Sequence, residues 1–347
     1  KGGFIGVDIF FVISGYLITS IIFRELQSTG SFSFKKFYER RIRRIIPVLL
    51  LVMLTTLPLG WMYLLPLDFV EFSKSALFSL GFSSNLYFHY DGQQYGAASG
   101  LLKPLLHTWS LSVEEQYYLF FPIIFFILFK YLKKYLIHFF LVGLILSVLI
   151  ADWSSRTYPS VSFYFLHTRI WELFAGSILA YLEIKLGNRS ENKILNSFFP
   201  FIGLALIGIS IYFFNDKMFH PSFNSLPPVI GVSLIIWFSS KDDFITKILS
   251  TKLFVGIGLV SYSLYLWHYP IFAFSRITQF TQGDIFKKIL LSIIILIISI
   301  ISYFMVEKPF RNRNNKMNLV GSFVLAGSLL LIILNYAVIK NNGFQKR

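Results

Sequence analysis

Long apolar stretches separated by short polar segments run along almost the whole sequence. Ten of them predict membrane-spanning helices, although several fall short of the roughly 20 residues that a straight span needs. Residues 68–88, "LDFVEFSKSALFSLGFSSNLY", are mixed in polarity and predict a helix at the membrane surface. The pattern therefore predicts an all-α fold, a polytopic integral membrane helix bundle without a soluble domain. The ten stretches are 4–23, 45–66, 113–129, 135–151, 169–183, 198–214, 226–239, 253–275, 286–306 and 318–339.

The composition supports a membrane protein. Of the 347 residues, 55% are hydrophobic and 40 are Phe, more apolar surface than a soluble domain can bury. The absence of cysteine removes any argument for a disulfide or a thiolate-bound metal. A net charge of +15 would suggest nucleic acid in a soluble protein. Beside these apolar stretches it indicates loops that contact anionic membrane lipids, and no nucleic-acid partner is expected.

The distribution of Lys and Arg predicts the orientation, because basic residues concentrate in cytoplasmic loops. Alternate loops hold 20 and 8 of the 32 basic residues, so the first set is predicted to be cytoplasmic. Both ends of the chain then lie outside. Since residue 1 is Lys and an apolar run begins at Phe4, we expect a further helix upstream that enters from the cytoplasm. The cytoplasmic loops are 24–44, 130–134, 184–197, 240–252 and 307–317, and the outer loops are 67–112, 152–169, 215–225 and 276–288.

Asp8 lies near the outer end of the first apolar stretch. An ionisable group within the membrane costs at least a few kcal/mol, which makes Asp8 a candidate functional residue. The alternative is that Asp8 caps the start of a helix at the interface, and the sequence leaves both open. Ser14 and Gly15 lie deeper, where a glycine permits close contact between helices.

The window "LLHTWSLSVEEQYYLFFP" holds several polar candidates. Ser112 and Glu115 have the spacing of a capping box, which predicts a helix start there. Glu114 then remains, on the same helical face as Tyr118. A histidine and a carboxylate near one membrane face, here His107 and Glu114, suit a base and the group that orients it. On spacing alone the favoured alternative is an interfacial cluster with belt aromatics, which would be Trp109, Tyr117 and Tyr118.

"HTRIWELFAG" places Arg169 and Glu172 three residues apart, a spacing that supports an ion pair at an outer helix end. A structural salt bridge is the favoured interpretation of this pair.

"SYSLYLWHYP" places Ser261, Tyr265 and His268 along one helical face. Pro270 frees the carbonyl of Leu266, which predicts a kink or a helix end at the histidine. His268 is either a ligand contact or an interfacial residue beside the neighbouring tryptophan, and the sequence leaves both open.

"KKFYERRIRRII" occupies residues 35–46, and six of its twelve residues are Lys or Arg. Orientation needs only a surplus of basic residues, which the lysines and the neighbouring loops already supply. On a helix, Arg40 and Arg44 share a face and Arg41 lies at its flank. Like charges this close repel unless an anion lies between them, either a lipid phosphate or a bound ligand. The Walker, H-E-x-x-H and G-x-S-x-G motifs are absent from the sequence, so those chemistries lack support.

Taken in order, these windows resemble the membrane acyltransferase family 3, in particular its O-antigen-acetylase-like branch. The resemblance implies transfer of an acyl group, usually acetyl from cytoplasmic acetyl-CoA, to a hydroxyl of an extracytoplasmic glycan. Such an acceptor is lipopolysaccharide O-antigen or another envelope polysaccharide, in some cases lipid-linked. It also implies the bacterial inner (plasma) membrane and no metal. The matching stretches are "GGFIGVDIFFVISGYLI", "FYERRIRRIIP", "HTWSLSVEEQYYLFFP", "RIWELFAG", "SYSLYLWHYPI" and "EKPFR".

The resemblance assigns residues to roles. The family's first helix carries an Arg and, after ten intervening residues, a His taken to be catalytic. That helix is absent from this sequence, so the main catalytic histidine is expected upstream and its role is not transferred to another His. The residues implied are Glu114, Asp8 and His268 for catalysis, Arg40, Arg41 and Arg44 for acetyl-CoA, and His107, Tyr118, Arg169 and Glu172 for the substrate.

Two regions are expected. Residues 1–317 form an N-terminally truncated membrane acyltransferase domain, and 318–347 form an additional C-terminal transmembrane helix and the start of an extracytoplasmic linker. In this branch such a linker often leads to an SGNH-hydrolase-like domain. The first alternative function is a transporter or flippase of a glycan or acyl donor, without covalent chemistry. The second is a membrane scaffold that binds lipid through the basic loop.

Overall fold

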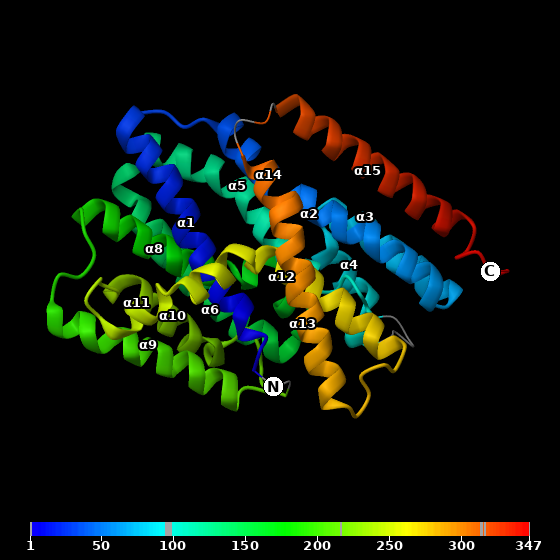
Figure 1. Cartoon of the computed structure of the whole chain (residues 1–347). Helices are drawn as coiled ribbons and strands as arrows, with labels where there is room; N and C mark the ends of the chain where they lie inside the picture. Colours follow the sequence, from blue (N-terminus) through cyan, green and yellow to red (C-terminus); the bar gives the residue numbers. More distant parts are fainter. Residues whose placement is uncertain (1, 94–98, 216, 313–314, 316, 347) are drawn as a thin grey trace. The chain divides into compact units, whose positions relative to one another are not determined.

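The computed structural model describes residues 2–93, 99–215, 217–312, 315 and 317–346, and these residues form helices and no strand (Figure 1). This confirms the predicted all-α class. The chain divides into two compact units, one of Lys1–Phe32 and Val113–Val255, the other of Ser33–Ser112 and Gly256–Arg347. The predicted regions 1–317 and 318–347 stay a prediction, and their outer limits, residues 1 and 347, lie outside the described residues.

Seven helices of the described part are long and apolar enough to cross a membrane. The protein is therefore a multi-pass helical membrane protein. Five of them are single helices: α1 (Ile5–Thr29), α2 (Phe34–Tyr63), α5 (Thr108–Tyr131), α9 (Lys193–Phe213) and α15 (Met317–Lys340). The sixth, Lys133–Thr157, contains α6 (Leu136–Thr157). The seventh, Ile285–Arg311, consists of α13 (Ile285–Ser302), η5 (Tyr303–Glu307) and α14 (Lys308–Arg311).

The predicted count of ten spans is not confirmed. The other three apolar stretches form α8 (Ile170–Leu186), α10 (Leu226–Phe238) and α12 (Lys252–Ile277). With 17 and 13 residues, α8 and α10 are about 26 and 20 Å long, less than a hydrocarbon core of roughly 30 Å. With 26 residues α12 is long enough, but serine, tyrosine and histidine side chains interrupt its apolar sequence.

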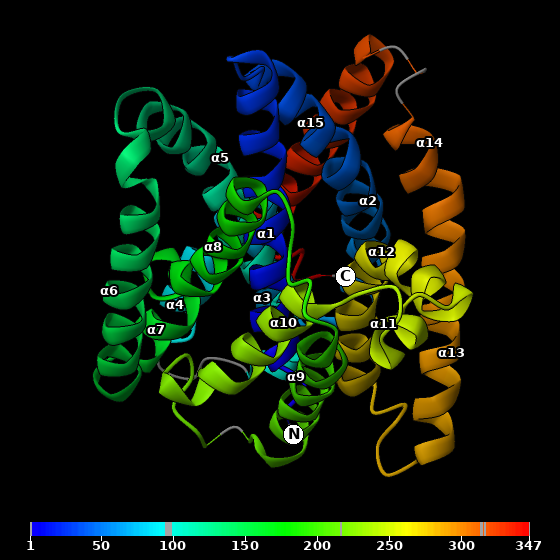
Figure 2. The same ribbon diagram turned by 90° about the vertical axis from the view of Figure 1, so that its left-hand side faces the viewer.

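In the first unit, α1 packs closely along α8, which also contacts α6 (Figure 2). A Cβ atom on Gly15 would lie 1.8 Å from the carbonyl oxygen of Leu173, and one on Gly176 would lie 1.9 Å from that of Val12. The two helices therefore touch backbone to backbone, as predicted for Gly15. α9 packs on α10. The buried core that joins α1, α6, α8 and α10 consists of Val12, Val148, Ala151, Trp171, Val229 and Val232.

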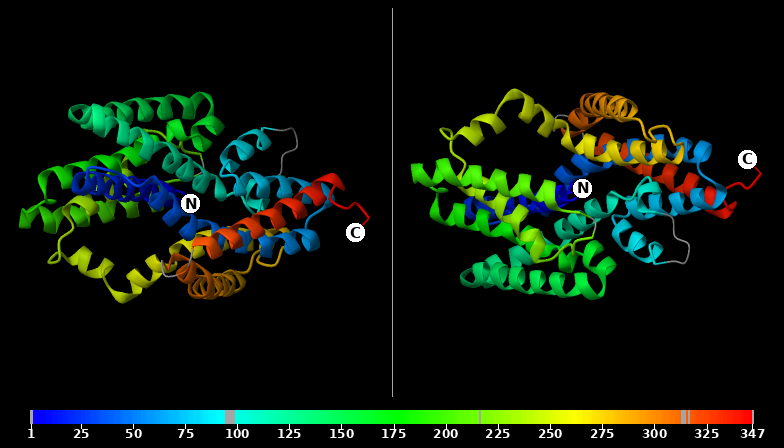
Figure 3. Two further views of the ribbon diagram at one scale, coloured as in Figure 1. Left: turned by 90° about the horizontal axis from the view of Figure 1, so that it is seen from above. Right: turned by 90° about the horizontal axis from the view of Figure 1, so that it is seen from below.

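In the second unit, α15 lies along α3 (Pro66–Leu80) and α2 (Figure 3). The predicted surface helix over 68–88 is two helices, α3 and α4 (Ser84–Asp91), because the chain turns at Gly81–Ser83 and Phe82 adopts a positive φ of 51°. The basic segment and the apolar run that follows it form one continuous helix, α2, with Pro47 and Pro58 inside it. The remaining short helices are α7 (Pro159–Tyr164), α11 (Phe244–Leu249), η1 (Gly100–Leu102), η2 (Lys133–Tyr135), η3 (Leu166–Thr168) and η4 (Phe223–Ser225).

Candidate functional site

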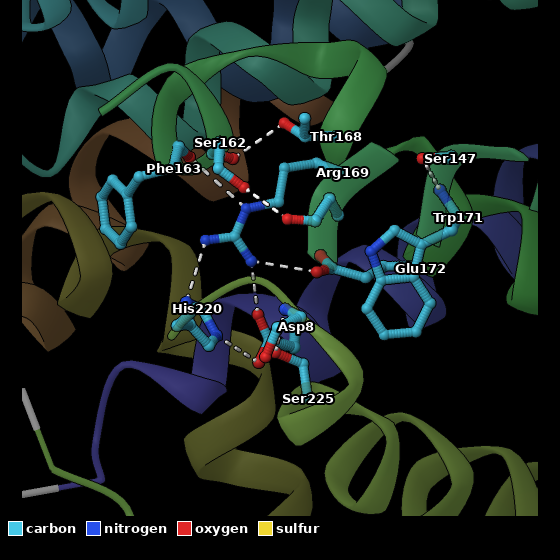
Figure 4. A network of polar contacts seen from close by, with 12 residues as sticks. Asp8, Ser147, Ser162, Phe163, Thr168, Arg169, Trp171, Glu172, His220 and Ser225 are labelled. Atoms are coloured by element: carbon cyan, nitrogen blue, oxygen red, sulfur yellow. Dashed lines mark hydrogen bonds and ion pairs between the residues drawn. The ribbon is translucent and has the colours of Figure 1, made fainter. Parts of the chain in front are cut away.

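A buried ionic network joins α1 to α8 (Figure 4). Asp8 Oδ1 accepts a hydrogen bond of 2.8 Å from Arg169 Nη1, which also donates to Glu172 Oε1 at 2.9 Å. The predicted ion pair of Arg169 and Glu172 is thus confirmed, and Asp8 joins it. All three residues are 0% exposed. The N-cap of α1 is Phe4, so the alternative that Asp8 caps the helix start is wrong.

His220 is the fourth member of this network, and it was not predicted. Arg169 Nη2 lies 3.3 Å from its Nδ1, and its Nε2 lies 2.9 Å from Asp8 Oδ2. A guanidinium only donates, so Nδ1 accepts and the proton of the neutral ring is on Nε2, from which it is donated to Asp8. Burial lowers the pKa of His220, and Arg169 acts in the same direction, against the effect of Asp8.

The network ties α1, α8 and the segment between α9 and α10 together. Both carboxylate oxygens of Asp8 are engaged, whereas Glu172 Oε2 is buried and has no hydrogen-bond partner among the described residues. Two carboxylates thus share one guanidinium. The complete burial of the ion pairs fits the structural salt bridge favoured above. Substrate binding by Arg169 and Glu172, and a catalytic role for Asp8, stay predictions.

A second buried cluster of the first unit joins Ser14 of α1 to Glu114 and Tyr118 of α5. The hydroxyls of Ser14 and Tyr118 both donate to Glu114 Oε1, and the two hydroxyl oxygens lie 2.6 Å apart. None of the three residues is more than 4% exposed. The predicted shared face of Glu114 and Tyr118 is confirmed. The contact with Ser14, 100 residues away along the chain, was not predicted.

The start of α5 corrects two interpretations. The helix begins at Thr108, so the capping box of Ser112 and Glu115 is wrong. The Ser112 hydroxyl instead accepts from the backbone N–H of Ser84 at 3.2 Å. Trp109, Tyr117 and Tyr118 are 6%, 2% and 3% exposed, so they are core residues rather than an interfacial aromatic belt.

In the second unit, His107 precedes α5 and packs against two aromatic rings of α12. Its ring stacks on Tyr269 at 5.3 Å and meets the edge of His268 at 5.7 Å. His107 is 6% exposed, and both of its ring nitrogens are buried. Burial, reinforced by the neighbouring His268, holds the pKa of His107 well below its usual value. The ring is therefore neutral near pH 7.

His268 lies inside α12, which continues through Pro270 to Ile277. Of the two predicted alternatives the helix end is therefore wrong, and the kink stays a prediction. Its Nδ1 lies 2.6 Å from the carbonyl oxygen of Tyr265. A carbonyl only accepts, so Nδ1 carries the proton and Nε2 of the neutral ring keeps its lone pair. Tyr265 lies beside it, at 6.0 Å between ring centres, whereas Ser261 is exposed and donates to the carbonyl of Gly258.

The arginines of α2 are not equivalent. Arg43 is buried, donates to the carbonyl oxygen of Asn315 at 2.9 Å and pairs with Glu39 at 3.1 Å. It also donates to the carbonyl oxygens of Phe310 and Asn312. Arg43 therefore holds the segment after α14 against α2. Partly exposed on this helix are Arg40, Arg41 and Arg44, the three residues predicted to bind acetyl-CoA.

Comparison with known proteins places the chain in a family. The family model described as an acyltransferase domain, acyltransferase family 3, matches residues 2–308. No solved structure matches the chain.

Named relatives agree with this match. Peptidoglycan O-acetyltransferase OatA of Listeria monocytogenes is 32% identical over 337 residues, which is 93% of this chain and 53% of the relative. YrhL of Bacillus subtilis, provisionally named a peptidoglycan O-acetyltransferase, is 31% identical over 90% of this chain and 51% of the relative. A provisionally named O-acetyltransferase of Staphylococcus aureus strain COL is 31% identical over 99% of this chain and 59% of the relative.

The chain thus spans between half and three fifths of the length of these relatives. The family match, in contrast, covers nearly all of the chain. By that match, the chain belongs to the acyltransferase family 3.

Proposed function

We propose that the protein is a membrane O-acetyltransferase that moves an acetyl group from acetyl-CoA to a hydroxyl of a cell-envelope glycan. The observation that carries this proposal is the family match over residues 2–308. The resemblance described above suggests an envelope polysaccharide such as O-antigen as the acceptor. The names of the relatives favour peptidoglycan instead, and peptidoglycan is the acceptor proposed here.

The proposed reaction requires a base at the acceptor hydroxyl. The hydroxyl oxygen attacks the thioester carbonyl while the base removes its proton, and the CoA thiolate then leaves and takes up a proton. In this chain His268 is proposed to orient the acceptor hydroxyl. Its Nδ1–H is bound to the Tyr265 carbonyl, so its Nε2 lone pair is available to accept a hydrogen bond from that hydroxyl.

The remaining polar residues receive proposed roles on each side of the membrane. Arg40, Arg41 and Arg44 bind the phosphates of CoA at the cytoplasmic side, because planar guanidinium groups match phosphate oxygens. Glu114 accepts hydrogen bonds from the hydroxyls of Ser14 and Tyr118, which hold its carboxylate in place, and it serves as a proton acceptor during turnover. His107 packs against His268 and holds its ring in place.

The experiment uses the full-length protein in vesicles with acetyl-CoA labelled in its acetyl group. The proposal predicts label in the glycan as an ester that mild alkali releases. A transporter or flippase would move the glycan or the donor without forming an ester. Label that crosses the membrane but never becomes alkali-labile on the glycan would contradict acyl transfer.

A further inference from the structure

Residues 307–311, "EKPFR", form one of the stretches that resemble the family, and the proposed reaction gives them no role. They begin where the helix that starts as α13 changes its hydrogen-bond pattern. The π-helical turn η5 ends at Glu307, and α14 follows directly. Turns of this kind inside helices occur frequently at functional sites. By the predicted orientation, this end of the helix lies at the cytoplasmic side, as the arginines of α2 do.

Glu307 is a buried carboxylate with a partner on each oxygen. The residue is 1% exposed. Its Oε2 accepts a hydrogen bond of 2.8 Å from the hydroxyl of Ser263 on α12, and its Oε1 accepts one of 3.1 Å from Nη1 of Arg311 on α14. A buried carboxylate is costly unless its oxygens are paired, so these two bonds fix its position. Glu307 in turn holds one side of the Arg311 guanidinium.

The arginine-bearing helix α2 packs against η5 and α14. Arg43 donates to the carbonyl oxygens of Phe310 and Asn312, the two neighbours of Arg311 in the chain, at 3.4 and 3.3 Å. The backbone on both sides of Arg311 is therefore bound to α2. This contact places Arg311 next to the basic half of α2, where the acetyl-CoA phosphates are proposed to bind.

Arg311 has donors left for a ligand. Its side chain is 40% exposed, and Glu307 binds its Nη1. A guanidinium has five N–H donors, so this bond leaves others that can reach a phosphate. The charge of Arg44 on α2 also acts on the Glu307 carboxylate. One buried carboxylate thus attracts two guanidinium groups that would otherwise repel each other.

We propose that Arg311 is a further phosphate-binding residue for the acetyl-CoA donor and that Glu307 is its positioning residue, an inference that rests on the function proposed above. Arg311 binds phosphate oxygens from α14 while Arg44 binds them from α2. Glu307 does not touch the donor. It holds the guanidinium of Arg311 from the buried side, so that less side-chain entropy is lost when the donor binds.

The sign of one effect separates this role from two simpler ones. Glu307→Gln removes a negative charge, and by charge alone it would strengthen the binding of an anionic donor. If Glu307 positions Arg311, the same variant weakens binding, because a neutral amide holds a guanidinium less firmly than a carboxylate does. A carboxylate that only stabilises the fold would leave the affinity of the folded protein unchanged.

The test is binding of acetyl-CoA to the full-length protein in nanodiscs, measured by calorimetry without glycan. Arg311→Gln should weaken binding by about tenfold, and Glu307→Gln by about threefold. Arg311→Lys keeps the charge and loses the planar fork, so it should weaken binding by about fivefold. Unfolding curves give the amount of folded protein in each preparation. Since Arg311 is partly exposed, its two variants test the site even if Glu307→Gln does not fold.

Lys308→Gln is the matched control, because it removes a positive charge three residues away from Arg311. The Lys308 ammonium lies 5.3 Å from the centre of the Phe304 ring, and the variant should bind acetyl-CoA like the parent. Equal weakening by Lys308→Gln or parental affinity of both Arg311 variants would overturn the proposal for Arg311. Unchanged or tighter binding by folded Glu307→Gln would overturn the positioning role.

Binding and acyl transfer are separable in this design. A parent that binds acetyl-CoA and loses affinity on Arg311→Gln, but transfers no acetyl group, would support this site and count against the proposed function alone. Acetyl transfer by the parent, with parental affinity in both Arg311 variants, would count against this inference alone. A parent that does not bind acetyl-CoA would contradict the proposed donor and this site together.

Discussion

Asp8 and Glu114 are both buried acids, but their partners give them different properties. Asp8 accepts hydrogen bonds from the guanidinium of Arg169 and from His220, so both of its carboxylate oxygens are engaged. Glu114 accepts hydrogen bonds from two hydroxyls, those of Ser14 and Tyr118. Substitutions around Asp8 should therefore act mainly on stability, and substitutions at Glu114 mainly on turnover.

Arg169→Met should destabilise the protein by about 3–5 kcal/mol, because it leaves the carboxylates of Asp8 and Glu172 buried without their cation. Unfolding in detergent measures this change. Arg156→Met is the control, since Arg156 forms an exposed pair with Asp152 and should leave unfolding almost unchanged. Similar effects of the two substitutions would show that the buried network does not stabilise the fold.

Glu114→Gln should lower acetyl transfer by about tenfold or more at normal expression, because it keeps the shape and removes the proton acceptor. Glu115→Gln is the neighbouring control and should have a small effect, since Glu115 is only partly buried. Acetyl transfer to glycan, normalised to the amount of folded protein, is the measurement. Equal loss in both variants would contradict this division between the two acids.

At the scale of elements, the basic half of α2 holds one structural arginine, Arg43, and three arginines that are proposed to bind acetyl-CoA. Arg43→Ala should destabilise the second unit by about 1.5–3 kcal/mol, since it removes charge-assisted bonds to the segment after α14.

Arg41→Lys and Arg44→Lys should unfold like the parent and weaken acetyl-CoA binding, because lysine keeps the charge but loses bidentate contact with phosphate. Unfolding curves and acetyl-CoA binding are measured on the same preparations. Parental binding by both lysine variants would leave the cluster with an orientation role only.

The segment between α9 and α10 should respond to pH through His220. Its pKa is lowered in the folded protein, so its contribution to stability is fully present above about pH 6.5 and is lost as the pH falls through the lower folded value. The charged groups around it are Asp8 on α1, Glu172 on α8 and Arg169 at the N-cap of α8.

The melting temperature of the parent should therefore fall more steeply between pH 7 and pH 5 than that of His220→Gln. The difference between the two curves is the readout, because other buried histidines such as His107 titrate in both proteins. Parallel curves would contradict a pH-dependent contribution from this segment.

Local sequence patterns predicted contacts within one helix, whereas contacts between residues far apart in the sequence became visible only in the folded structure. Glu114 and Tyr118 lie four residues apart, so their shared face follows from helical geometry. The contacts of Asp8 with Arg169 and His220 span 161 and 212 residues, and no periodicity encodes them. The predicted ends of helices were wrong where tertiary packing outweighs the local sequence preference for a helix start or stop. Thr108 begins α5 four residues before the predicted cap, and α12 continues through Pro270.

For the whole molecule, the distribution of charge favours a crossing of the membrane by α8, whereas the short length of α8 argues against one. Twenty of the 32 basic residues lie in one set of alternate loops, which requires α8 to cross the membrane if the predicted alternation holds. The 17 residues of α8 span only about 26 Å, so a crossing would need local thinning of the bilayer. The ionic network at its start, with Arg169 fully buried, gives that end of α8 a polar anchor inside the protein.

Single cysteines can decide whether α8 crosses, because the sequence has no cysteine of its own. Thr157→Cys places a thiol at an exposed position in the chain before α8, and Asn188→Cys places one at an exposed position after it. We expect a membrane-impermeant maleimide to label Thr157→Cys in intact cells, and Asn188→Cys only after the membrane is permeabilised. Labelling of both from the same side would show that α8 does not cross, and the predicted alternation of loops, with its ten helices, would then fail at this point of the chain.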